Sequence, residues 1–126
     1  MVNKKKWTIV PMAIALMSMT SCVSQPKSLY SWYGYEDAAY QNNKKQTEKT
    51  EETFVKQISK VMEKQVGSRH IVPPGIFAEY GYFLIKKGKV QEGTDMLHKE
   101  IETYPESQVF ITRIINQVEP STNETK

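Results

Sequence analysis

The chain has 126 residues, enough for one domain, of which 39% are hydrophobic and 25% are charged. Its formal net charge is +3, but Lys4, Lys5 and Lys6 lie in an N-terminal segment with the pattern of a cleaved leader. When these three lysines are left out, 14 of the 17 basic residues remain, which equals the number of acidic residues, 14. This balance of zero gives no indication of nucleic acid or of an anionic membrane surface as a partner.

Residues 1–21 are predicted to be a lipoprotein signal peptide. The three lysines form a positive start, and an apolar run of 13 residues follows from Trp7 to Met19. A membrane-spanning helix needs about 20 apolar residues. The run is therefore too short to span a bilayer and is typical of the apolar core of a signal peptide.

The end of this segment, Met19-Thr20-Ser21-Cys22, resembles the bacterial lipobox, with methionine where leucine is commoner. Cys22 is the only cysteine, so it cannot form an internal disulfide. A diacylglycerol on its thiol and an acyl chain on the amine freed by cleavage would anchor the chain, because two or more lipid chains hold firmly. We predict lipid attachment at Cys22, with palmitate incorporation as its signature. An uncleaved anchor or an incidental free thiol is the alternative.

Residues 22–29 are predicted to be a lipidated tether. No Asp follows Cys22, which by the usual enterobacterial sorting convention directs the anchor to the outer membrane. No acidic run of the kind used for surface export follows either, so the domain is expected to face the periplasm.

The stretch from Leu29 to Tyr40 is rich in aromatic residues, namely Tyr30, Trp32, Tyr33, Tyr35 and Tyr40. Such side chains combine a large apolar body with a polar tip. Three interpretations remain open: a cap on the helices that follow, a partner-binding strip at Tyr30, Trp32 and Tyr35, or stacking on carbohydrate or nucleic acid, for which interleaved basic residues are missing. Residues 36–40 are predicted to begin a short helix, and residues 41–49 either continue it or form a loop.

Residues 51–66 are predicted to form a helix. Its apolar residues recur with the helical period: Phe54, Ile58, Val61 and Met62, with Val66 left open as a fifth member of the stripe. Glutamates in the first turn and Gly67 after the end fit the usual start and stop signals. Pro73-Pro74 then marks an extended hinge.

Residues 73–105 are predicted to form two antiparallel helices joined by a turn at Gly88. The apolar stripe of the first is Ile76, Phe77, Tyr80, Phe83 and Leu84, and that of the second is Val90, Leu97, Ile101 and Tyr104. Gly81 and Gly93 are small where the helices would cross. A mid-helix glycine costs about 1 kcal/mol relative to alanine, which is usually accepted where another backbone comes close. Pro105 ends the second helix.

A last helix is predicted from Ser107 to about Val118, packed on the second helix of the pair through Phe110, Ile111, Ile114, Ile115 and Val118. It is short and cannot be stable alone. Residues 119–126 are predicted to be a disordered polar tail.

The central pair resembles a tetratricopeptide repeat, a helix pair of about 34 residues. The matching positions are Phe77, Tyr80, Gly81, Leu84, Gly93, Leu97 and Pro105, whereas Glu100 stands where the repeat has a small residue. One repeat cannot bury its own face. The expected fold is therefore all-α: a tetratricopeptide-like antiparallel helix pair flanked by one helix on each side, in a single small domain over residues 30–118.

No catalytic constellation is visible. His70 and His98 are the only histidines, and His98 with Glu102 would supply two ligands where a metal site needs at least three. The glutamates near helix ends are interpreted as exposed charges: Glu51, Glu52, Glu100 and Glu102. We expect no enzyme activity, no cofactor and no metal site.

The whole chain resembles a family of small bacterial lipoproteins that carry a domain of unknown function. The resemblance rests on Cys22, Leu29-Tyr30, Trp32, Tyr35-Glu36, Tyr40, Pro73-Pro74-Gly75, Ala78, Gly81, Leu84, Gly88 and Tyr104-Pro105-Glu106-Ser107. Members resemble tetratricopeptide helix pairs and are often encoded beside two other lipoproteins, one similar to the curli-secretion channel subunit. The resemblance implies an accessory role in an envelope assembly or secretion complex, with other envelope lipoproteins as partners and no nucleic acid. The alternative is a periplasmic ligand-binding or cell-wall-active enzymatic lipoprotein.

Overall fold

The structure, a computed structural model, describes the backbone of residues 27–123 and the side chains of residues 27–118. The predicted signal peptide, Cys22 and most of the predicted tether lie outside the described residues, as do residues 124–126. Between residues 27 and 123 the chain forms five α-helices, a short 3-10 helix and no strand, which confirms the expected all-α class.

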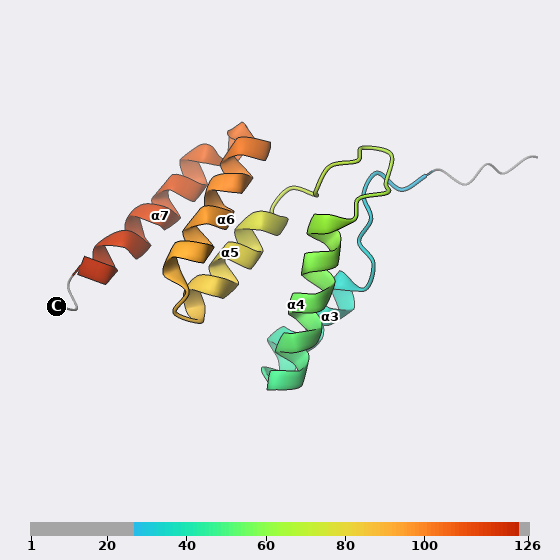
Figure 1. The fold of residues 1–126 in the computed structure, drawn as a ribbon, viewed down its shortest axis with the longest axis horizontal. Coiled ribbons are helices and arrows are strands. Elements are labelled where there is room, and N and C mark those ends of the chain that lie inside the picture. Colours follow the sequence, from blue (N-terminus) through green and yellow to red (C-terminus); the bar gives the residue numbers. More distant parts are fainter. Residues whose placement is uncertain (1–26, 124–126) are drawn as a thin grey trace, which may run out of the picture.

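The helices, in chain order, are α3 (Tyr35–Lys45), α4 (Glu48–Glu63), α5 (Ile76–Lys86), α6 (Val90–Thr103), the 3-10 helix η1 (Pro105–Ser107) and α7 (Gln108–Asn123). α3 packs on α4, and each helix from α4 to α7 contacts the next, so that α4, α5, α6 and α7 form a row (Figure 1). The expectation of one flanking helix on each side of the central pair is wrong on the N-terminal side. There, residues 35–45 form a second helix, α3, which confirms the short helix predicted to begin at residues 36–40 and continues it to Lys45.

Helix α4 begins at Glu48, three residues before the predicted start, because Thr47 caps it. The Thr47 hydroxyl accepts a hydrogen bond from the backbone N–H of Thr50 at 3.3 Å, and the Thr50 hydroxyl accepts one from the N–H of Thr47 at 2.9 Å. This reciprocal pair satisfies N–H groups that a helix start leaves unpaired. The helix ends at Glu63 rather than at Val66, and residues 64–75 connect it to α5. Val66 therefore lies after the helix and is 75% exposed instead of joining the buried stripe.

Helices α5 and α6 cross at two glycines, as predicted. A Cβ added to Gly81 would lie 2.6 Å from the carbonyl oxygen of Gly93, and one added to Gly93 would lie 2.5 Å from that of Gly81. The turn between the helices is at Gly88, whose φ of +80° favours glycine. Helix α6 ends at Thr103, and Pro105 follows the C-cap residue Tyr104, as expected.

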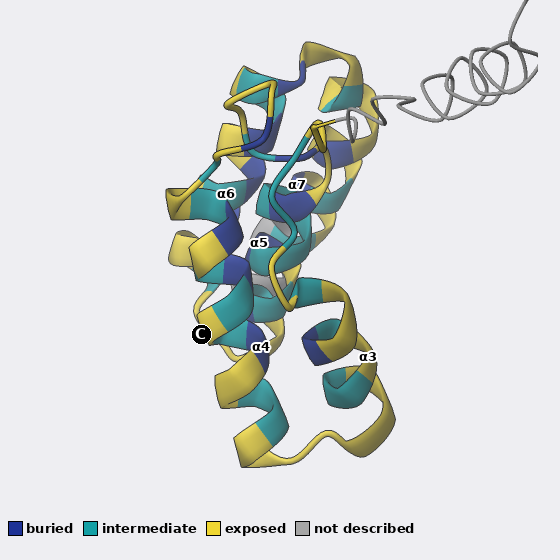
Figure 2. Ribbon diagram, turned by 90° about the vertical axis from the view of Figure 1, so that its right-hand side faces the viewer, coloured by how far each residue is buried: buried dark blue, intermediate teal, exposed yellow. Residues whose placement is uncertain are grey.

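The core has two parts, and buried residues lie mainly where helices meet (Figure 2). The first joins α4 to the start of α5 and contains Phe54, Ile58, Val61 and Ile76. The second joins α6 to α7 and contains Leu97, Ile111 and Ile115. Burial of these side chains supplies most of the driving force that holds the helices together.

Helix α7 differs from its prediction in the burial of Phe110 near its start and in the residue at which it ends. Phe110 was expected in the buried stripe, but it is 65% exposed, because Ile111 and Ile115 fix the side of the helix that faces α6. The helical backbone continues to Asn123, beyond the predicted end at about Val118. No helix within the described residues is long and apolar enough to cross a membrane.

Candidate functional site

The N-terminal segment is fastened to the connection between α4 and α5. The backbone carbonyl of Ser28 accepts a hydrogen bond from the N–H of Ser68 at 3.0 Å, and that of Leu29 accepts one from Arg69 at 3.1 Å. The two backbones touch at Gly67, where a Cβ would lie 2.5 Å from the carbonyl oxygen of Leu29. Residues 27–31 and 64–71 therefore form one end of the domain.

The aromatic residues of this segment continue as a row into the core. Neighbouring ring centroids lie 5.3–6.3 Å apart along Tyr30, Trp32, Tyr35, Phe54 and Phe83. The predicted docking residues Tyr30, Trp32 and Tyr35 are all half-buried, and the last two pack against the first core cluster. This is the geometry of a cap on the helices. Docking of a partner at the three residues stays a prediction.

Tyr35 also ties α3 to α5 through a polar contact. Its hydroxyl donates a hydrogen bond to the Glu79 carboxylate. Burial raises the pKa of Tyr35 well above its usual range, and the hydrogen bond to Glu79 and the charge of that carboxylate raise it further. The Glu79 carboxylate therefore accepts a hydrogen bond from the uncharged hydroxyl group of Tyr35.

A second polar cluster joins the N-terminal segment to the end of α6. Arg69 Nη1 donates to the Tyr30 hydroxyl at 2.9 Å, a contact that raises the pKa of the guanidinium. The Tyr104 hydroxyl donates to the carbonyl of Val72 at 2.6 Å. Burial, followed by the neighbouring Tyr30 hydroxyl, raises the pKa of Tyr104 to about 12. These contacts hold Tyr30 against the connection between α4 and α5, and hold that connection against the end of α6.

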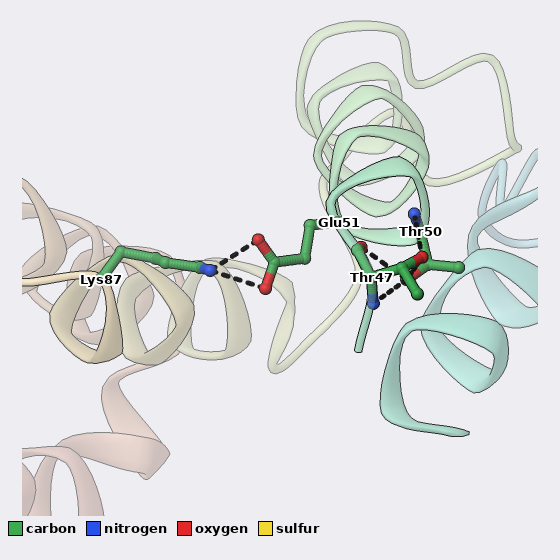
Figure 3. A network of polar contacts seen from close by, with 4 residues as sticks. All are labelled: Thr47, Thr50, Glu51 and Lys87. Carbon is green, nitrogen blue, oxygen red and sulfur yellow. Dashed lines mark hydrogen bonds and ion pairs between the residues drawn. The ribbon is translucent and has the colours of Figure 1, made fainter. Parts of the chain in front are cut away.

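A cleft of about 270 Å³ lies between α3, the start of α4 and the second half of α5. Its lining is Ala39, Asn42, Asn43, Gln46, Glu51, Phe54, Glu79, Tyr82, Phe83, Lys86 and Lys87. Lys87 Nζ lies 2.5 Å from a carboxylate oxygen of Glu51, which links α5 to α4 beside the capping threonines (Figure 3). Since Glu79 is bound by Tyr35, both carboxylates of the cleft have partners.

Glu100 corrects a sequence interpretation. It was expected to be exposed, but it is 2% exposed, and its carboxylate accepts hydrogen bonds from the backbone N–H of Gly75 at 2.7 Å and of Ala78 at 3.4 Å. Glu100 of α6 thus caps the first turn of α5, where N–H groups lack partners within the helix and the helix dipole favours an anion. Nothing local in the sequence signals this contact, because its partners lie 22 and 25 residues away.

The remaining chemistry-bearing residues are dispersed. His70 and His98 are both exposed. Among residues 27–118, no three or more His, Cys, Asp or Glu side chains gather so that they could hold a metal ion. The predicted lipid attachment residue, Cys22, lies outside the described part of the chain.

These features define a small all-α domain. It consists of a row of helices, with the N-terminal segment bound to the connection between α4 and α5. Residues 29–114 match the family model of a domain of unknown function, DUF4810. The match covers more than half of the chain, so the chain belongs to this family. No curated protein and no solved structure shows a significant match.

Proposed function

We propose that the protein is a lipoprotein anchored through Cys22 in the outer membrane, with its domain facing the periplasm. There it acts as a non-catalytic interaction module in an envelope assembly or secretion complex. Its partners are other envelope lipoproteins, including one similar to the curli-secretion channel subunit. The pattern of residues 1–22 supports the anchor, and the outer face of α7 carries the interaction role.

Helix α7 ends the row and leaves apolar side chains uncovered. Val109 is 68% exposed and Phe110 is 65% exposed, while Ile111 and Ile115 face α6. In stacked helical arrays each element buries its apolar face on the next, and a terminal element normally carries a polar outer face. Exposed apolar neighbours at this place favour a partner helix that continues the row.

The module is tetratricopeptide-like in this proposal. Support comes from the close crossing at Gly81 and Gly93 and from the burial of Leu84 and Leu97 at the expected positions. Glu100 departs from the repeat pattern. The departure is compatible with the pair, because the carboxylate reaches the start of α5.

A second candidate is the ligand-binding alternative, with the cleft between α3 and α5 as its site. The observation that favours it is Asn42 Oδ1, a buried acceptor that lacks a hydrogen-bond partner in the structure. Since buried acceptors are usually satisfied, a ligand N–H or O–H group would fit here. Asn42→Ala should then abolish saturable binding of that ligand and leave binding of the protein partner unchanged.

Photo-crosslinking in membranes tests the interaction role. A photoreactive side chain at position 110 of the lipidated protein should give an adduct with another envelope protein, and one at position 82 should give far less. Tyr82 is a suitable control because it is 53% exposed on α5. The identified partner, once purified, should bind Phe110→Ser at least about tenfold more weakly. Equal adducts from both positions, or unchanged binding, would exclude α7 as the interface.

A further inference from the structure

The chain after Cys22 has equal numbers of basic and acidic residues, but exposed cations are in excess at one end of the domain. Residues 27–35 and 64–78 contain Lys27, Lys64 and Arg69 and no Asp or Glu. The hydrogen bonds from residues 68 and 69 to residues 28 and 29 hold the two segments together. Glu63 directly precedes Lys64, and the buried Glu100 carboxylate reaches Gly75 and Ala78. The exposed cations Lys27, Lys64 and Arg69 nevertheless outnumber the exposed carboxylates of these two segments, although the chain after Cys22 has a balance of zero.

The same end exposes apolar side chains. Val66 is 75% exposed, Leu29 is 57% exposed and Ile71 is 36% exposed. We call Lys27, Leu29, Lys64, Val66, Arg69 and Ile71 the basal patch. Apolar side chains mixed with Lys and Arg are typical of surfaces that lie in the membrane interface, where apolar groups enter the headgroup boundary and cations meet anionic lipids.

The chain enters the domain at this patch. Lys27 is five residues after Cys22, and five residues span at most about 17 Å when fully extended. Helix α4 has 16 residues and is about 24 Å long, with the basal patch after its C-terminal end and the turn before Thr47 at the other. A lipid on Cys22 would thus hold the basal patch, rather than the far turn, next to the bilayer.

We propose that the basal patch rests on the surface of an anionic phospholipid bilayer. The position of the patch rests on the proposed lipid anchor at Cys22, whereas the exposed side chains that make the contact belong to the domain itself. The contact fixes the orientation of the row of helices. It places the turn between α3 and α4, and the cleft residues Asn43 and Gln46 beside it, away from the membrane.

Vesicle binding by the unlipidated chain separates this contact from the anchor. The chain from residue 22 to residue 126 with Cys22→Ser should cosediment with vesicles of phosphatidylglycerol and phosphatidylethanolamine at low salt. It should dissociate at high salt, because screening weakens surface electrostatics. Leu29→Ser with Val66→Ser, and separately Lys27→Gln with Lys64→Gln, should each weaken vesicle binding at least about fivefold. Thermal melts of each variant confirm that the domain is folded.

Matched variants outside the basal patch, one on α5 and one near the turn before α4, serve as controls. Tyr82→Ser replaces an apolar side chain of similar exposure, and Lys44→Gln with Lys45→Gln removes two cations near the turn before α4. Both controls should bind vesicles like the parent chain. Equal loss in controls and patch variants, or no vesicle binding by the parent chain, overturns the proposal. A protein adduct from a photoreactive side chain at position 66, without vesicle binding, would assign the patch to a protein instead.

The proposed lipid anchor and the proposed membrane contact of the basal patch can be disproved independently of each other. Absence of palmitate from the wild-type protein would disprove the lipid anchor and leave the vesicle result of the unlipidated chain unaffected. Vesicle binding that does not depend on the patch would disprove the membrane contact and leave the anchor intact.

Discussion

Gly81 of α5 and Gly93 of α6 face each other where the two helices cross. The backbone of each glycine occupies the space that a side chain on the other glycine would need. A Cβ on either would come within 2.6 Å of the carbonyl oxygen of its partner, closer than nonbonded atoms tolerate. The obstacle is backbone, which cannot turn aside as a flexible side chain can. The two glycines therefore set the distance between the helices at the centre of the domain.

Replacement of either glycine by alanine should destabilise the domain. The clash forces the helices apart, and because the obstacle is backbone its cost should lie toward the upper end of about 1–3 kcal/mol, above the roughly 1 kcal/mol by which alanine favours a helix over glycine. Urea unfolding of Gly81→Ala and Gly93→Ala measures this. Gly34→Ala is the control, because the nearest atoms to its added Cβ belong to a side chain, at 3.4 Å. Stability equal to wild type in both helical variants would contradict the close crossing.

This crossing was predictable from the sequence, since small residues at corresponding places in two amphipathic helices have a direct physical meaning. The phase of α7 was harder to predict. Phe110 and Ile111 are adjacent and both apolar, so periodicity alone does not decide which of them faces α6. The position of α6 decides it, and that is a tertiary effect.

Removal of the Glu100 carboxylate should loosen the start of α5. Glu100→Ala leaves the N–H groups of Gly75 and Ala78 without their acceptor in a buried place, at a cost of about 2–3 kcal/mol. Glu100→Gln keeps one acceptor oxygen and should cost less. Denaturant unfolding checks the order, with Glu102→Ala on the exposed side of α6 as a control that changes stability by less than about 0.5 kcal/mol.

Alkaline pH should weaken the domain through Tyr104. Its pKa in the folded state is about 12, against about 10 in an unfolded chain. The folded state holds this proton more tightly, so the stabilisation is complete below pH 10 and is lost as pH rises toward 12. Tyr104→Phe loses the hydrogen bond to Val72, at about 1 kcal/mol. The stability gap between wild type and Tyr104→Phe should narrow between these pH values, and a constant gap would refute the assignment.

Cys22→Ser should abolish lipidation and leave the precursor uncleaved by the lipoprotein peptidase. The thiol is the only group at this position that can form the thioether, and cleavage follows lipid attachment. Radiolabelled palmitate and gel mobility measure the two effects in cells. Label in Cys22→Ser, or none in the wild-type protein, would show that Cys22 is not the lipid attachment site.

The role of the N-terminal aromatic segment shows another limit of sequence reasoning. The spacing of Tyr30, Trp32 and Tyr35 is compatible both with a cap and with an exposed strip. The segment is also held by Gln65, which accepts a hydrogen bond from the N–H of Ser31 at 2.9 Å and donates one to its carbonyl at 3.0 Å. Ser31 and Gln65 are 34 positions apart in the sequence, so no local pattern predicts this contact.

Trp32→Ala separates capping from partner docking. Trp32 lies on Tyr35, with ring centroids 5.8 Å apart, and packs against the first core cluster. We expect its loss to cost about 2 kcal/mol, less than for a fully buried tryptophan, and to lower the melting temperature. Binding of the partner found by crosslinking is then measured at a temperature where the variant is folded. If binding falls by about 2 kcal/mol or more, Trp32 docks the partner in addition to packing. If binding equals that of the wild-type protein, Trp32 acts as a cap alone, and the docking prediction for this residue is wrong.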